Sequence, residues 1–192
     1  MSRVILNQGQ FVFDRFKKIV SVGVFLGCLG FLEAKNSVFF LPYEKREALN
    51  TLISSISSAK ESVKIAIYSF THKDIALAIK SVASRGVKVE IIYDYESNHN
   101  NKQSTSGYLA KYPNIKACLL RGLRAKNRNN YYGIMHQKLA IIDDKMVFLG
   151  SANWSKNAFE NNYEVLLKTD DTDTALKARS YFKKMLGSCV GF

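Results

Sequence analysis

The sequence of 192 residues is short of several residue types, and each shortage narrows the class of protein. With only two prolines, no low-complexity tract and 47% hydrophobic residues, it has the composition of a folded chain rather than a disordered one. Its three cysteines form no C-x-x-C pair and no cysteine–histidine spacing typical of zinc, so we expect no metal and no cofactor. The length suits one domain with a full-sized core.

Acidic residues are also scarce. The chain has 16 Asp and Glu against 28 Lys and Arg, a net charge of +12. Such a protein is drawn to polyanions, either nucleic acid or an anionic membrane surface, although basic residues can also serve solubility alone. The scarcity is greatest over residues 97–142, which contain no Asp or Glu.

Two of the cysteines, Cys118 and Cys189, lie far apart in the sequence. We expect them to be free, buried thiols. In an oxidising compartment they could instead pair with each other.

Residues 1–34 have the pattern of a targeting segment. Basic residues precede the uncharged run Ile19 to Leu32, which is too short to span a membrane comfortably as one helix. We interpret residues 1–34 as a signal peptide or a membrane anchor, which would place residues 35–192 outside the cytoplasm. The alternative is a buried helix of the folded domain.

From residue 36 onward, short apolar runs alternate with amphipathic stretches. Strands are predicted at 38–41, 63–70, 87–93, 115–120, 138–142, 146–150 and 163–169. Helices are predicted at about 44–60, after a capping box at 71–74, more weakly at 104–112, and at the C-terminus after a cap at Asp170 or Thr172. We expect the last helix to turn Ala175, Leu176, Ala178, Tyr181, Phe182 and Leu186 inward. This order predicts an α/β fold with a mixed, largely parallel sheet flanked by helices on both faces.

The segment 121–133 (RGLRAKNRNNYYG) is predicted to be a loop that contacts substrate. Guanidinium groups can pair with phosphates and tyrosine rings can stack on bases, which suits an extended nucleic-acid strand. The candidate contacts are Arg121, Arg124, Lys126, Arg128, Tyr131 and Tyr132. A solvated surface loop would have the same composition, but this one directly precedes a possible catalytic histidine.

That histidine is His136, and strand alternation places it on the same side as Lys138. If the two strands over 138–150 form a hairpin, Ser151 and Asn153 reach the same end of the sheet. Histidine is a competent nucleophile toward phosphorus when one ring nitrogen is free and the other is held by an acceptor, for which Glu164 is our candidate. Lys138 and Asn153 would then stabilise the charge on phosphorus.

These residues resemble the histidine–lysine–aspartate signature of the phospholipase D superfamily. Six specified positions match at fixed spacing: His136, Lys138, Asp143, Gly150, Ser151 and Asn153. The resemblance implies a phospholipase D-like fold for residues 35–192, a phosphohistidine intermediate, no metal, and a supporting role for Asp143 in the fold or a dimer interface. Most members carry two such motifs and this chain has one, so the resemblance also implies a homodimer.

Single-motif chains of this kind most resemble the small bacterial endonucleases of the family, some of them membrane-associated. We therefore expect a metal-independent endonuclease of the bacterial cell envelope, periplasmic or membrane-anchored. It should prefer single-stranded nucleic acid, DNA rather than RNA, with little sequence specificity. Two alternatives stay open: hydrolysis of an anionic phospholipid such as cardiolipin, and a nucleic-acid receptor without activity. His72 is either a further substrate contact or an ordinary residue at a helix start.

Overall fold

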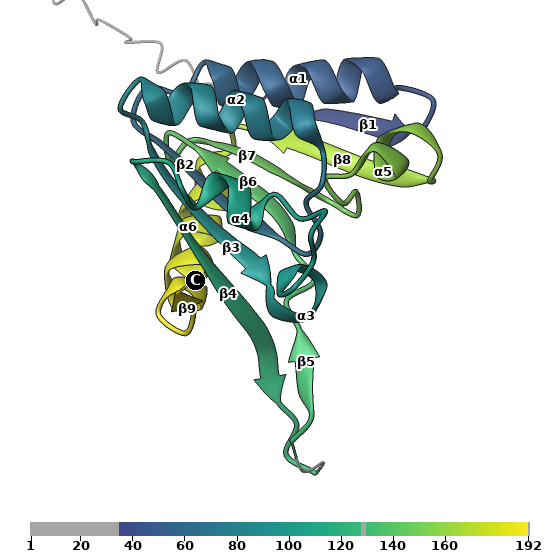
Figure 1. Ribbon diagram of the computed structural model, residues 1–192. Helices are drawn as coiled ribbons and strands as arrows, with labels where there is room; N and C mark the ends of the chain where they lie inside the picture. Colours follow the sequence, from purple (N-terminus) through teal and green to yellow (C-terminus); the bar gives the residue numbers. More distant parts are fainter. Residues whose placement is uncertain (1–34, 128–129, 192) are drawn as a thin grey trace, which may run out of the picture. The chain divides into compact units, whose positions relative to one another are not determined.

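The computed structural model describes residues 35–127 and 130–191, which form a nine-stranded sheet flanked by helices (Figure 1). The strands are β1 (Ser37–Leu41), β2 (Ser62–Ile67), β3 (Lys88–Asp94), β4 (Ile115–Arg124), β5 (Tyr132–Ile134), β6 (Lys138–Ile142), β7 (Met146–Gly150), β8 (Glu164–Thr169) and β9 (Val190–Gly191). The helices are α1 (Lys45–Ser57), α2 (Lys73–Ser84), α3 (Tyr95–Asn98), α4 (Ser106–Leu109), α5 (Lys156–Glu160) and α6 (Thr172–Leu186). The predicted segment 1–34 lies outside the described residues.

The sheet is mixed, as predicted, but it is not largely parallel. Its order is β1-β8-β7-β6-β2-β3-β4-β5, with β9 beside β4, and only β2, β3 and β4 pair in parallel. Parallel neighbours need a long crossover, which α2 and the segment containing α4 supply. By contrast, β6 and β7 are joined by the short turn at residues 143–145, so they can pair only as an antiparallel hairpin.

Helices cover both faces of the sheet, which confirms the predicted α/β layering (Figure 1). On one face, α1 and α2 bury Leu52, Ile56 and Ile79 in the larger core cluster. On the other face, α6 packs Ala175 and Phe182 in a second cluster. Every residue of β6 is buried, so the strand that follows His136 is packed on both faces and is held in place by its neighbours.

The helix ends differ from the predictions in two places. The residue before α2 is His72, whose side chain makes no capping hydrogen bond, so the predicted capping box does not form. The cap of α6 is Asp171 rather than Asp170 or Thr172, and its carboxylate accepts a 2.8 Å hydrogen bond from the backbone N–H of Thr174. Because only one stripe of α6 meets the sheet, the predicted inward residues Leu176 and Tyr181 are exposed.

The predicted loop 121–133 is in large part a β-hairpin. Strand β4 continues to Arg124 and pairs with β5, with a register shift between Arg121 and Arg124. A Cβ atom on Gly122 would overlap the backbone of Gly133, so glycine permits the close approach of the two strands there. The hairpin extends from the edge of the sheet (Figure 1), and Arg128 lies outside the described residues.

A disulfide joins Cys118 in β4 to Cys189, so the expectation of free thiols is wrong. The tertiary reason is the antiparallel pairing of β4 with β9, which follows α6 and brings the two Cα atoms to 5.8 Å. Among the described residues, no helix is long and apolar enough to cross a membrane.

Candidate active site

The side chains of His136 and Lys138 are in direct contact. Lys138 is the first residue of β6, and His136 lies two residues before it. The Nζ atom of Lys138 lies 3.0 Å from Nε2 of His136 and also donates a 3.0 Å hydrogen bond to the backbone oxygen of His136. An ammonium group can only donate, so Nε2 accepts and carries the ring's lone pair when Lys138 is charged. His136 is exposed, whereas Lys138 is only 6% exposed. The arrangement places the ring of an exposed histidine in hydrogen-bond contact with a buried amino group.

The electrostatics of Lys138 have opposing causes. Burial lowers the pKa of its ammonium group, and the negative charges of Glu164 and Asp94 partly oppose that shift. Both carboxylates therefore help Lys138 to remain a cation that can neutralise a phosphate.

Ser151 and Glu164 form the second pair of the site. The Oγ atom of Ser151 donates a hydrogen bond to Glu164 and accepts one of 3.0 Å from the backbone N–H of Val165. Glu164 also accepts from the side chain of Asn162 at 3.3 Å. Within residues 35–127 and 130–191, the Glu164 carboxylate makes these contacts rather than the predicted one with His136. It acts on the site through Ser151 and through the charge of Lys138.

Gly150 and Asn153 flank Ser151 in the segment that leaves β7. A Cβ atom on Gly150 would overlap the carbonyl oxygen of Val165, so this position requires glycine for strand β8 to approach. The Oδ1 atom of Asn153 is buried and has no hydrogen-bond partner in the described part of the chain. Asn153 thus has an unpaired hydrogen-bond acceptor near Ser151.

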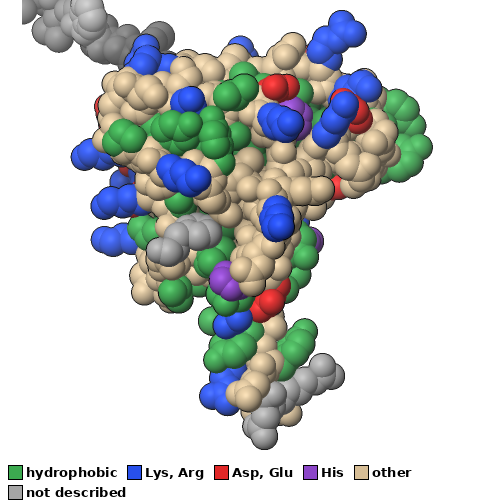
Figure 2. Space-filling model, viewed as in Figure 1, with side chains coloured by type: hydrophobic (Ala, Val, Ile, Leu, Met, Phe, Trp, Pro, Cys, Tyr) green, Lys and Arg blue, Asp and Glu red, His purple; other side chains and the backbone are tan. Residues whose placement is uncertain are grey.

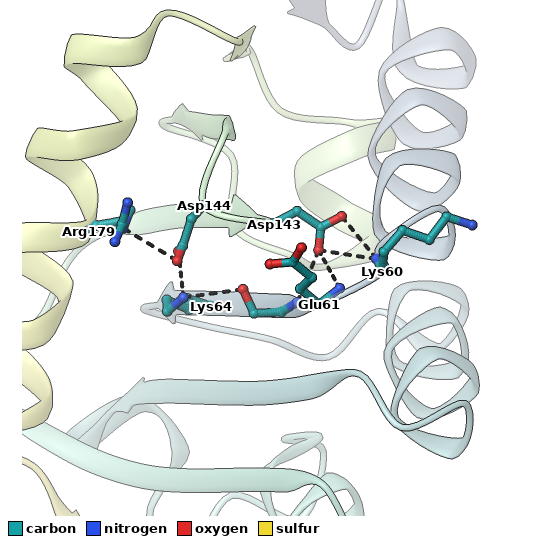
Figure 3. A network of polar contacts seen from close by, with 7 residues as sticks. Lys60, Glu61, Lys64, Asp143, Asp144 and Arg179 are labelled. Atoms are coloured by element: carbon teal, nitrogen blue, oxygen red, sulfur yellow. Dashed lines mark hydrogen bonds and ion pairs between the residues drawn. The ribbon is translucent and has the colours of Figure 1, made fainter.

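Asp143, the aspartate of the signature, contacts backbone rather than the histidine–lysine pair (Figure 3). Its carboxylate accepts hydrogen bonds of 2.8 to 3.1 Å from the backbone N–H groups of Lys60, Glu61 and Ser62, at the entry to β2. Partial burial opposes ionisation, but these hydrogen bonds outweigh it and hold the pKa of Asp143 below its usual value. The neighbouring Asp144 binds Lys64 and Arg179, which ties the same turn to α6.

Three residues that support His136 were missed by the sequence analysis: Tyr68, Asp94 and Asn98. The Tyr68 ring meets the His136 ring edge-on, with centroids 4.6 Å apart. The Oδ2 atom of Asp94 accepts a 2.8 Å hydrogen bond from the backbone N–H of Met135, the residue before His136. Asn98 donates to the backbone oxygen of Tyr68 at 2.7 Å. The available signal was the position of Asp94 at the end of a strand, where functional groups gather in α/β sheets.

The other predicted contacts fall into two groups. Arg121, Arg124 and Tyr132 line the same cavity as His136, and Lys126 is exposed farther along the hairpin. Figure 2 shows Lys and Arg side chains on the hairpin and across the face in view, where Asp and Glu are fewer. Tyr131 is exposed on the hairpin as well.

His72 does not join this group. Its ring packs edge-on against Phe159, and it is not among the described residues that line the cavity with His136. Burial lowers the pKa of His72, although Asp74 and Glu160 oppose the shift. The ring is therefore mainly neutral at pH 7, which makes it a weak partner for phosphate. No group of three or more His, Cys, Asp or Glu side chains in the described chain is arranged to hold a metal ion.

The chain is similar to known proteins in both sequence and fold. Residues 52–186 match the family described as "Cardiolipin synthase, PLD-like domain". The mitochondrial cardiolipin hydrolase of Mus musculus is 29% identical over 133 residues, which cover 69% of this chain and 55% of that protein. The chain spans about half the length of the curated relatives that it matches.

Two solved structures are similar along their whole length. NucT from Helicobacter pylori is 82% identical, with a TM-score of 0.81, and the match covers 83% of this chain and 100% of that one. Nuc from Salmonella typhimurium, described as a phospholipase D family member, is 26% identical with a TM-score of 0.69, covering 83% of this chain and 99% of that one.

Proposed function

The chain belongs to the phospholipase D-like family, as its signature predicted, and we propose that it is a Nuc-type phosphodiesterase that cuts nucleic acid internally. The contact between His136 and Lys138 at an exposed strand end carries the proposal. Single-stranded DNA is the preferred substrate, ahead of RNA, with little sequence specificity. Arg and Tyr side chains of the hairpin support this choice, because they bind phosphates and stack on bases without reading base edges.

The reaction begins when Nε2 of His136 attacks phosphorus. Lys138 shifts its hydrogen bond from Nε2 to a non-bridging phosphate oxygen, which frees the lone pair. Lys138, Asn153 and Ser151, whose hydroxyl turns from Glu164 to the phosphate, stabilise the charge on five-coordinate phosphorus, where the loss of one donor costs ~10²–10³ in rate. The bond from phosphorus to the leaving oxygen breaks and a phosphohistidine forms. Water then cleaves the phosphorus–nitrogen bond and restores His136. These side chains supply both nucleophile and positive charge, so we propose that activity persists in chelator.

A second imidazole is needed to protonate the leaving oxygen and later to deprotonate water. The chain has three histidines, and the other two are engaged elsewhere: His72 packs against Phe159, and His99 stacks on Tyr95. We therefore propose a homodimer in which two copies of His136 face each other across a two-fold axis.

The proposed location is the bacterial cell envelope, with residues 1–34 as signal or membrane anchor. The basic flank and the uncharged run of this segment support export. The Cys118–Cys189 disulfide supports it independently, because such bonds persist in oxidising compartments. Protease accessibility in intact cells would test this placement.

The activity is tested by incubating the full chain with single-stranded DNA, duplex DNA and RNA in excess chelator. We expect cleavage of single-stranded DNA to be fastest and to be abolished in His136→Ala. Acid quench during turnover should trap phosphate on His136, which separates an enzyme from a binding protein. Absence of cleavage, or cleavage that His136→Ala leaves unchanged, would contradict the proposal.

The second candidate function is hydrolysis of an anionic phospholipid. The cardiolipin-acting names of the family and of several relatives favour it, and the same site chemistry would attack either diester. Competition between single-stranded DNA and cardiolipin vesicles decides between them. Faster turnover of the lipid, inhibited weakly by DNA, would favour the lipid.

A further inference from the structure

A groove runs from His136 between the β4–β5 hairpin and the C-terminal half of α6. Its volume is about 840 Å³, within the range of roughly 300–1,000 Å³ that is usual for ligand pockets. The hairpin side includes Arg121, Leu123, Arg124, Tyr132 and Ile134, and the helix side includes Tyr181, Lys184 and Met185. We call this space the hairpin groove.

The charge of the hairpin groove is of one sign. Arg121, Arg124 and Lys184 line it, and no Asp or Glu does so among the described residues. Two of its aromatic rings are available to a ligand, since Tyr132 is 43% exposed and Tyr181 is 52% exposed. Cations beside exposed rings match a ligand with both phosphates and flat bases.

The hairpin wall of the groove is preorganised. The Arg121 guanidinium lies 3.6 Å from the ring centroid of Tyr95 and 5.8 Å from that of Tyr132. Its Nε also donates a 3.0 Å hydrogen bond to Glu96, which fixes the plane of the guanidinium group. On Tyr95, the His99 ring stacks with centroids 4.6 Å apart. These groups hold the wall before any ligand arrives.

The opposite wall is a single turn of α6. Tyr181 and Lys184 are three residues apart, so they lie on the same side of the helix. The Nζ atom of Lys184 is 4.6 Å from the ring centroid of Tyr181. A stacking ring and a cation are thus paired at this wall, as at the Arg121 and Tyr132 wall.

We propose that the hairpin groove holds the unpaired nucleotides next to the scissile phosphate, and that Tyr181 and Lys184 form its substrate-binding wall on α6. The proposal rests on the proposed nuclease function and adds a cause for its strand preference. Stacking on Tyr132 and Tyr181 requires exposed base faces, which a duplex does not offer. The phosphates lie along Arg124 and Lys184, and the strand enters the site at His136.

The test compares kcat/KM for a single-stranded oligonucleotide with kcat/KM for a small chromogenic diester that has no bases. Base stacking is worth ~1–3 kcal/mol, so we expect the ratio to fall about 5- to 160-fold in Tyr181→Ala and to recover in Tyr181→Phe. Lys184→Ala should lower the ratio and weaken its dependence on salt. Matched controls are Lys183→Ala, on α6 but outside the groove, and Tyr108→Ala, an exposed tyrosine on α4. Both controls should keep the wild-type ratio.

The outcomes separate the two proposals. If the wild type cleaves neither substrate in a His136-dependent way, the nuclease function itself fails. If single-stranded DNA is cleaved but Tyr181→Ala and Lys184→Ala match their controls, the groove proposal alone is overturned. Sedimentation velocity is the second measurement: a Tyr181→Ala chain that changes its oligomeric state would assign the groove to contact between copies instead.

Discussion

The carboxylate of Asp94 accepts a 2.8 Å hydrogen bond from the backbone N–H of Met135, across 41 positions of sequence. Its other oxygen accepts a 2.8 Å hydrogen bond from the backbone N–H of Ser97. Asp94 is only 1% exposed. The residue that precedes His136 is therefore anchored to the end of β3, so the proposed nucleophile is positioned from a strand that carries none of the signature.

Asp94→Asn should impair catalysis more than substrate binding. An amide has one acceptor and one donor group, so either Met135 or Ser97 would face an NH₂ group instead of an oxygen, at a cost of about 1–3 kcal/mol. We expect kcat to fall at least tenfold with little change in KM. The loss of a negative charge also lowers the pKa of Lys138 further, so the alkaline limb of the kcat profile should move to lower pH. An unchanged pH profile would limit Asp94 to a structural role.

Gly150→Ala should separate β7 from β8. The new methyl group would overlap the carbonyl oxygen of Val165, next to the hydrogen bond between the Ser151 N–H and Val165. We expect a loss of stability of roughly 1–3 kcal/mol, as for other overpacked sites, and a large loss of activity because Ser151 is displaced. Urea unfolding and kcat measure the two effects. Gly107→Ala is the matched control, since open space surrounds that position.

The Cys118–Cys189 disulfide should stabilise the chain. It closes a sequence separation of 71 residues, and a loop of this size contributes about 2–4 kcal/mol by restricting the unfolded chain. Reductant should therefore lower the melting temperature of the wild type. The double variant Cys118→Ala/Cys189→Ala should start at the lower temperature and be insensitive to reductant; a wild type that ignores reductant would contradict the prediction.

Asp143→Asn should destabilise the fold in a pH-dependent way. The folded chain holds the pKa of Asp143 below its usual value, so this stabilisation is fully present above the unfolded pKa of about 3.9 and is lost as pH falls through the folded value. The variant should lose roughly 1–3 kcal/mol at neutral pH through weakened hydrogen bonds to the entry of β2. The difference from wild type should narrow in acid. Asp173→Asn, which removes an exposed carboxylate, is the control and should show a much smaller effect.

The contact between His136 and Lys138 could be predicted because it depends on local geometry. Two residues on one strand face the same side when they are two positions apart, and this holds for His136 and Lys138 whatever surrounds them. Most strands and the longer helices α1, α2 and α6 were also recognisable, because burial imposes a period of two or of 3.6 on apolar residues. Their caps were less certain, since Asp170, Asp171 and Thr172 are all good caps and packing selected Asp171.

The hairpin was predicted as a loop because Arg, Asn and Lys predominate over residues 121–133. An exposed edge strand has no buried face, so it shows no apolar alternation from which to recognise it. The parallel content of the sheet was overestimated for a related reason: strand order does not say which neighbours pair, and β1 pairs antiparallel with β8 from the other end of the chain.

The residues of the proposed chemistry thus lie in one short stretch of sequence, from His136 to Asn153, because spacing along paired strands sets which side chains meet. Three further relationships depend on the tertiary structure alone. They are the hydrogen bond between Met135 and Asp94, the disulfide between Cys118 and Cys189, and the shared cavity of Tyr132 and Tyr181. These contacts join residues far apart in the chain, and they form only because burial of two apolar clusters fixes β4 and α6 against the same sheet. The stretch of the proposed chemistry is local in sequence, whereas the residues that support it and line the cavity beside it are brought together by packing.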